Sequence, residues 1–169
     1  MAAQITWPSG RLLAEVAKRE HSWCFTFSGG GCVVTEAAWR LITKDGINVT
    51  SGDHGQLFGL SEPVDARARV LAATKGRKII DTRIADGTSD LVLAFEGAVR
   101  LELLNLSSGY EAWRATHGTD DVICLGGSAL SRNEKKGSPI TAANSAVGHA
   151  SCMRTSRALQ PPGRSVALG

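Results

Sequence analysis

Apolar and polar residues alternate most regularly between Asp90 and Trp113. On both sides of Gly97 every second residue is apolar, and these positions are Leu91, Leu93, Phe95, Val99, Leu101 and Leu103. Successive side chains of a strand point to opposite faces of a sheet, so this pattern predicts a β-hairpin with one buried face. Gly97 stands where the short turn between the two strands requires an unrestricted backbone.

Shorter alternating runs predict the other strands. They cover residues 23–27, 32–36, 39–43, 47–50, 77–85, 112–116 and 122–125. Gly29-Gly30-Gly31 and Asp45-Gly46 are typical turn sequences between such runs. We expect the apolar faces of these strands to share one core, which includes Trp23, Phe25, Leu93, Phe95, Leu101 and Trp113.

Two further segments show the spacing of amphipathic helices. The first begins after Ser9, a candidate N-cap, and runs to about Glu20; its apolar face comprises Leu12, Leu13, Val16 and Ala17. The second opens with Ser61–Asp65 and stops at Gly76; its inner face comprises Val64, Ala68 and Leu71. The predicted fold class is α+β: a mainly antiparallel, curved or partly closed β-sheet with two helices packed on it, formed by residues 1–130 as a single domain.

Charge is distributed unevenly along the chain. Residues 1–130 carry 13 Lys and Arg against 15 Asp and Glu, whereas residues 131–169 carry 6 Lys and Arg against 1 acid. The second segment also lacks aromatic residues and apolar periodicity, so it cannot bury enough apolar area to offset the entropy lost on ordering. We predict a disordered or loosely attached basic tail over 131–169. The near-neutral body argues against nucleic-acid binding, except weakly through this tail.

Other features of the sequence exclude several classes of protein. No apolar run approaches the roughly 20 residues of a membrane-spanning helix, and the start of the chain lacks a signal-peptide pattern, so we expect a cytoplasmic protein with no membrane partner. The four cysteines form no Cys-x-x-Cys pair and no zinc-like cluster with histidine. This predicts reduced thiols, no metal and no cofactor.

The irregular stretch 51–61 is the first candidate site. Asp53, His54 and Gln56 are polar residues on a glycine-rich loop, where binding and catalytic groups are often found. His54 could act as a general base with Asp53 nearby. In the alternative interpretation, these two residues cap a turn, and the large apolar residues of the loop, Leu57, Phe58 and Leu60, fill the core.

The stretch 107–114, SSGYEAWR, is the second candidate site. Tyr110, Glu111 and Arg114 could line a pocket or a partner surface, since tyrosine and arginine are frequent anchors of interfaces. In the alternative interpretation, Trp113 belongs to the core, and Glu111 and Arg114 form a surface ion pair.

Several motifs between Trp39 and Trp113 occur together: WRL and DGI, then VTSGDHG, FGL and PVDA, then SDLVLAFEG, LELLN and SSGYEAW, with Gly126-Gly127 beyond them. This combination resembles a group of small bacterial proteins of unknown function, some of which are regarded as immunity-like proteins of polymorphic toxin systems. The resemblance implies a shared fold and a protein partner such as a toxin, and it implies no catalytic residues. The end of the chain, residues 140–169, resembles the translated recombination site of an integron gene cassette.

These observations lead to two expectations about function. The first is a non-catalytic, immunity-like binding protein that recognises a protein partner or associates with itself, for which a homodimer is the commonest form. The alternative is a small-ligand-binding protein or enzyme that uses a cleft between the 51–61 and 107–114 loops, where Asp53, His54, Tyr110 and Glu111 would converge. Whether the protein is an enzyme stays open, with the non-catalytic function favoured.

Overall fold

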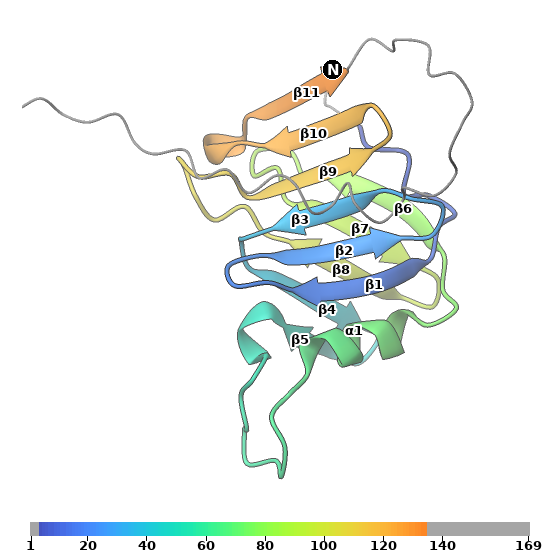
Figure 1. Ribbon diagram of the computed structural model, residues 1–169, viewed down its shortest axis with the longest axis vertical. Helices are drawn as coiled ribbons and strands as arrows, with labels where there is room; N and C mark the ends of the chain where they lie inside the picture. The colour runs from blue at the N-terminus through green and yellow to red at the C-terminus, as the bar shows by residue number, and fades with distance from the viewer. Residues whose placement is uncertain (1–3, 135–169) are drawn as a thin grey trace, which may run out of the picture.

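Eleven strands form within residues 4–134, the part of the chain that the structure describes, and in this computed structural model they build two antiparallel β-sheets that face each other (Figure 1). The first sheet has the order β1 (Leu13–Lys18), β2 (Trp23–Phe27), β3 (Cys32–Thr35), β9 (Trp113–His117), β10 (Asp120–Cys124) and β11 (Leu130–Glu134). The second has the order β5 (Gly46–Thr50), β4 (Trp39–Thr43), β8 (Val99–Leu103), β7 (Leu91–Phe95) and β6 (Ile79–Ile84). The molecule is therefore a β-sandwich.

The hairpin predicted from the alternating pattern is confirmed as β7 and β8. Leu91 pairs with Leu103, and Phe95 pairs with Val99 across the turn at Gly97. The six apolar positions of the pattern are all buried. They face the first sheet and form the centre of the core.

The predicted core is confirmed as well, because all six residues proposed for it belong to one buried cluster. At its centre, the ring of Trp39 meets the edges of two rings from β2. The centroid of Trp23 lies 4.8 Å away and that of Phe25 lies 5.5 Å away, both nearly perpendicular. Edge-to-face contacts of this kind join the second sheet to the first.

The prediction of a first helix, from Ser9 to about Glu20, is wrong, because residues 13–18 form strand β1. A β-bulge between Leu13 and Glu15 explains the misleading pattern. The bulge inserts one additional residue, so Leu13 and Val16, three positions apart, both face the core. A spacing of three is typical of a helix, but here it results from an irregular strand.

The second predicted helix exists as α1 (Ala66–Thr74), although it starts later than expected. Asp65 is its N-cap and accepts hydrogen bonds from the backbone N–H groups of Arg67 and Ala68. The helix ends just before Gly76, as predicted, but its buried residues are Ala66, Val70 and Thr74. It packs beside β1 and β5 and so closes one open side of the sandwich (Figure 1).

The predicted fold class is therefore wrong: the described chain is mostly β-structure in two sheets, and α1 is the one α-helix within residues 4–134. Two short 3-10 helices, η1 (Ser51–Asp53) and η2 (Gly126–Ser128), complete the elements. None of the helices of this described part is long and apolar enough to cross a membrane.

Strand β11 includes Ser131–Glu134, residues that the charge pattern assigned to the tail. They pair with β10, from Ser131 opposite Ile123 to Glu134 opposite Asp120. The rest of the predicted tail, residues 135–169, lies outside the described residues.

Four connections meet at one end of the sandwich and together form its surface there. Lys18, Thr35 and Leu103 are the last residues of their strands, and they pair with Trp23, Trp113 and Trp39, which are the first residues of theirs. The connections that follow β1, β3 and β8 therefore all lie at this end. The connections are residues 19–22, 36–38, 51–65 and 104–112. The segment 36–38 carries the chain from the first sheet to the second.

Candidate functional site

Two adjoining depressions lie at this end of the sandwich. The larger has a volume of about 600 Å³ and is lined by Lys18, Glu20, His21, Trp23, Glu36, Ala37, Ala38 and Ser51. The smaller has a volume of about 300 Å³ and is lined by Glu36, Ala37, Ala38, Leu106, Ser107, Tyr110, Glu111 and Ala112. Because both include residues 36–38, they form one continuous surface across the connection between the sheets.

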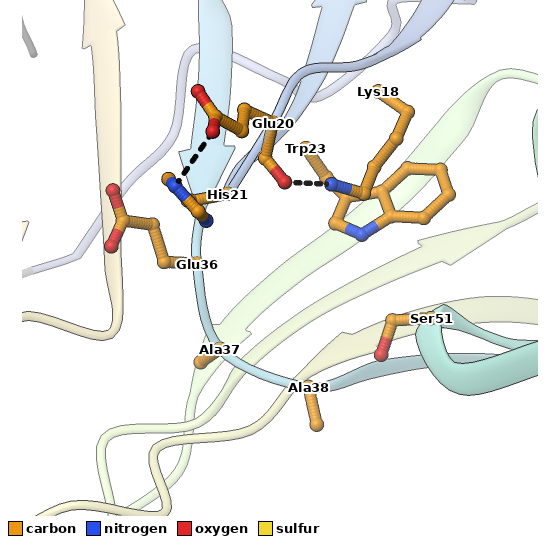
Figure 2. A pocket seen from close by; sticks show the side chains of 8 residues that line it. All are labelled: Lys18, Glu20, His21, Trp23, Glu36, Ala37, Ala38 and Ser51. Carbon is orange, nitrogen blue, oxygen red and sulfur yellow. Dashed lines mark hydrogen bonds and ion pairs between the residues drawn. The ribbon is translucent and has the colours of Figure 1, made fainter. Parts of the chain in front are cut away.

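The larger depression is shallow and polar. Figure 2 shows Glu20, His21 and Glu36 on one side of it and Trp23 on the other. The imidazole of His21 lies 3.4 Å from the carboxylate of Glu20, and both side chains are largely exposed. Lys18 lies 5.6 Å from the centroid of the Trp23 ring and donates a hydrogen bond of 2.8 Å to the carbonyl of Glu20.

The residues predicted in the 51–61 loop hold the loop in place and do not line either depression. Asp53 accepts a hydrogen bond of 2.7 Å from the backbone N–H of Thr50. His54 packs edge-on against Trp23, with centroids 5.3 Å apart, and its Nδ1 accepts the backbone N–H of Ala66 at 3.2 Å. The same Nδ1 lies 3.7 Å from the carboxylate of Asp65, the N-cap of α1.

The large apolar residues of the same loop do not fill the core, contrary to the alternative interpretation. Leu57, Phe58 and Leu60 are 52%, 68% and 50% exposed. Gln56 is exposed and uses its backbone carbonyl to accept the N–H of Val64 at 2.9 Å. Of the 51–61 stretch, Ser51 alone lines a depression.

The residues predicted in the 107–114 loop do contribute to the smaller depression. Tyr110 and Leu106 lie on its margin, 81% and 75% exposed. The loop is held by Ser107, whose hydroxyl accepts the backbone N–H groups of Gly109 and Tyr110 at 3.1 and 3.0 Å. Tyr110 is therefore presented by an ordered loop.

Close packing of Gly126 against the backbone of Gly109 supports the 107–114 loop. A side chain on Gly126 would bring its Cβ within 2.4 Å of the backbone nitrogen of Gly109, so only glycine fits at this point of η2. The backbone N–H of Gly127 donates to the carbonyl of Ser107 at 3.1 Å. The connection 104–112 and η2 thus form one unit.

Glu111 has the most unusual environment of the predicted residues. Glu111 is an exposed residue, but the atoms packed around its carboxyl desolvate it and so raise its pKa; the positive charge of Arg114 opposes this shift, and the negative charges of Glu36 and Asp121 add to it. Arg114 itself donates two hydrogen bonds to Asp121, at 2.8 and 2.6 Å, so the ion pair predicted between Glu111 and Arg114 is replaced by a pair with Asp121. The pKa of Arg114 is raised mainly by its hydrogen bond to Asp121.

The two predicted loops thus lie at the same end of the sandwich, but neither depression is lined by both. The connection 36–38 separates Ser51 from Tyr110 and Glu111. No group of three or more His, Cys, Asp or Glu within residues 4–134 could hold a metal ion. Burial raises the pKa of the Cys124 thiol to about 11, so this buried sulfur is a thiol at neutral pH.

The sequence analysis missed the contributions of Lys18, Glu20, His21 and Glu36. Their positions at strand ends give no local signal, because the end at which a connection lies depends on how distant strands pair. Leu106 offered a weak signal, since it is a large apolar residue in a polar stretch that follows the hairpin.

Comparisons with protein-family models, with curated proteins and with solved structures found no match to this chain.

Proposed function

We propose that this protein is a non-catalytic, immunity-like binding protein that recognises a protein partner through the surface formed by residues 36–38 and 106–112. The observation that carries the proposal is the pair of exposed side chains Tyr110 and Leu106 beside a depression of about 300 Å³. Exposed aromatic residues on an ordered scaffold are favoured anchors of protein interfaces, because little entropy is lost when they are buried.

The charge of this surface indicates the chemistry of the partner. Glu36 and Glu111 lie on the smaller depression, where they are the charged lining residues; the larger one next to it is mixed, with Lys18 and His21 beside Glu20. The raised pKa of Glu111 reflects in part the repulsion from Glu36 and Asp121, which a cation would relieve. We infer that the partner presents a cationic segment, because opposite charges at an interface increase both the association rate and specificity.

Self-association through this surface is the less favoured form of the proposal. In a symmetric dimer the same patch faces itself, which would bring the Glu36 and Glu111 carboxylates of two copies together. Like charges placed against each other at an interface cost several kcal/mol. A cationic partner protein, such as a toxin carried beside this gene on the same mobile element, avoids this repulsion.

A small-ligand site or enzyme between the 51–61 and 107–114 loops has less support. The imidazole of His54 packs against the ring of Trp23 and accepts a hydrogen bond from the N–H of Ala66. The proposed general base therefore contacts Trp23 and the start of α1, and it lines neither depression.

The experiment is to co-purify this chain with the product of the neighbouring gene and to measure the dissociation constant by calorimetry. Tyr110→Ala and Glu111→Gln should each weaken binding by about 1 kcal/mol or more, a factor of about five, while the melting temperature stays within about 2 °C. Ile80→Ala is the matched control, because Ile80 is also exposed, at 61%, but lies on β6 away from this surface. Equal losses for Tyr110→Ala and Ile80→Ala, or binding that does not depend on Glu111, would contradict the proposal.

A further inference from the structure

The loop between η1 and α1 projects beyond the sandwich on the side that α1 covers (Figure 1). Its two legs are joined by the hydrogen bonds Gly55 N–H to Val64 carbonyl and Val64 N–H to Gln56 carbonyl, both 2.9 Å. At its end the N–H of Leu60 donates to the carbonyl of Leu57 at 2.7 Å. We call residues 57–60 the tip. The tip is a hydrogen-bonded turn, so its exposed side chains are presented in a defined position.

Phe58, an exposed aromatic residue, occupies a turn position at which asparagine is preferred. Phe58 and Gly59 have φ values of +46° and +78°, and positive values at both central residues are typical of a type I′ turn. Asparagine-glycine is preferred there, because a bulky residue at positive φ is strained. The strain at Phe58 is not offset by burial, since this side chain is 68% exposed. An unfavourable residue at an exposed position is typical of a functional contact.

The helix α1 presents a cationic surface on the same side of the molecule. Its inner residues pack against the sandwich, and its exposed residues are Arg67, Ala68, Arg69 and Ala72, followed by Lys75 at its C-terminal cap. Arg67 is paired with Asp65 at 2.9 Å. Arg69 and Lys75 therefore supply the remaining positive charge on the outer face of α1.

We propose that the tip and the outer face of α1 bind the surface of a lipid bilayer that carries anionic headgroups. Leu57, Phe58 and Leu60 would enter the boundary between headgroups and acyl chains, and Arg69 and Lys75 would contact the headgroup phosphates. Interfacial binding of this kind combines a small apolar surface with cations and needs no membrane-spanning segment. The proposal therefore departs from the expectation of no membrane partner, which rested on the lack of a membrane-spanning run and of a signal-peptide pattern in the sequence.

Charge complementarity favours a bilayer over an apolar pocket in another protein. Residues 51–78 contain five Lys and Arg and three acids. Two of the acids are engaged, Asp53 by the N–H of Thr50 and Asp65 by Arg67 and the helix N-terminus, which leaves Glu62 as the opposing charge. The tip is narrow, and three side chains suit shallow insertion into a soft interface. This surface shares no residue with the two depressions, so the inference is independent of the proposed function.

The test is co-sedimentation of the full chain with vesicles of phosphatidylcholine containing about one third phosphatidylglycerol, and with vesicles of phosphatidylcholine alone. The wild-type chain should bind the first and bind the second much more weakly. Phe58→Asn is the decisive variant, because asparagine suits the turn and the protein should stay at least as stable. It should lower the partition coefficient by about tenfold or more, which corresponds to removing one phenyl group from the interface.

Charge variants complete the test. Arg69→Glu and Lys75→Glu should each lower binding by at least about fivefold, whereas Arg83→Glu, an exposed cation on β6, should change it little. Failure of the wild-type chain to bind the anionic vesicles would overturn the proposal and leave the tip as a contact for a protein. Equal binding by Phe58→Asn and wild type would also overturn it, because binding would then arise elsewhere, as in the basic residues after 134.

Discussion

Arg114 on β9 directs its guanidinium at Asp121 on β10, with two hydrogen bonds of 2.8 and 2.6 Å to the carboxylate. Both side chains are mostly buried, with exposed fractions of 28% and 15%. Glu111, three residues before Arg114, is attracted by the same guanidinium at longer range and is repelled by Asp121. Burial is the larger cause of the raised pKa of Glu111, and the two charges of the pair change this pKa in opposite directions.

Asp121→Asn should lower the pKa of the Glu111 carboxyl. The substitution removes one of the negative charges that raise this pKa, and it releases Arg114 from a charged partner. In the wild type the folded state holds the Glu111 proton more tightly than the unfolded state, so stability falls as pH rises above the ordinary glutamate pKa; in the variant this decrease should be smaller. Titration of Glu111 followed by NMR measures the effect. Asp120→Asn, which affects the pair with Arg132 instead, is the control, and an unchanged Glu111 would show that burial alone sets its pKa.

Phe95→Ala should lower the free energy of unfolding by about 3–5 kcal/mol, because it leaves a cavity in a fully packed core. Phe95 is 1% exposed and belongs to the central hairpin. Chemical denaturation provides the measurement. Leu106→Ala, at a position 75% exposed, should change stability by less than about 0.5 kcal/mol. A Phe95→Ala protein of near-native stability would mean that the two sheets are not packed as described.

Two truncations should separate β11 from the segment that follows it. A chain that ends after Ser131 loses three residues of β11 and the hydrogen bonds of Arg132 to Asp120, at 2.9 and 3.0 Å. We expect its melting temperature to fall by several degrees, which corresponds to about 1 kcal/mol or more. A chain that ends after Glu134 should melt within about 5 °C of the full-length protein, because residues 135–169, the rest of the predicted tail, should be dispensable for folding. A fall of more than about 5 °C for the chain that ends after Glu134 would show that residues 135–169 contribute to stability.

Glu102→Gln should reduce the dependence of stability on pH in the acidic range. Burial raises the pKa of this carboxyl, but the hydrogen bonds from Arg40 and Arg100, both 2.6 Å, outweigh burial and the pKa is lowered overall. A lowered folded-state pKa contributes stability above the pKa of the unfolded chain, and this contribution is lost as pH falls through the folded value. Urea denaturation at several pH values measures it. At neutral pH the variant should be less stable by about 1–2 kcal/mol, with Glu96→Gln as an exposed comparison. An unchanged acidic slope would exclude Glu102 as its source.

The sequence alone determined the central hairpin and the membership of the core. Alternation along β7 and β8 is a local property, because any strand with one buried face must repeat every two residues. The same reasoning identified Trp23, Phe25 and Trp113 as core residues, and all are buried. It also located the end of α1 at Gly76, since a glycine after the last turn is a local helix signal.

Tertiary structure alone decided the features that depend on pairing between distant strands. The bulge in β1 exists because Leu13 and Val16 must both meet the opposite sheet, and its three-residue spacing cannot be distinguished locally from a helix. Equally, nothing within the loop sequence shows that Phe58 is exposed or that Tyr110 lies beside Glu36. Those relationships follow from long-range packing, which places segments far apart in the chain at the same end of the sandwich.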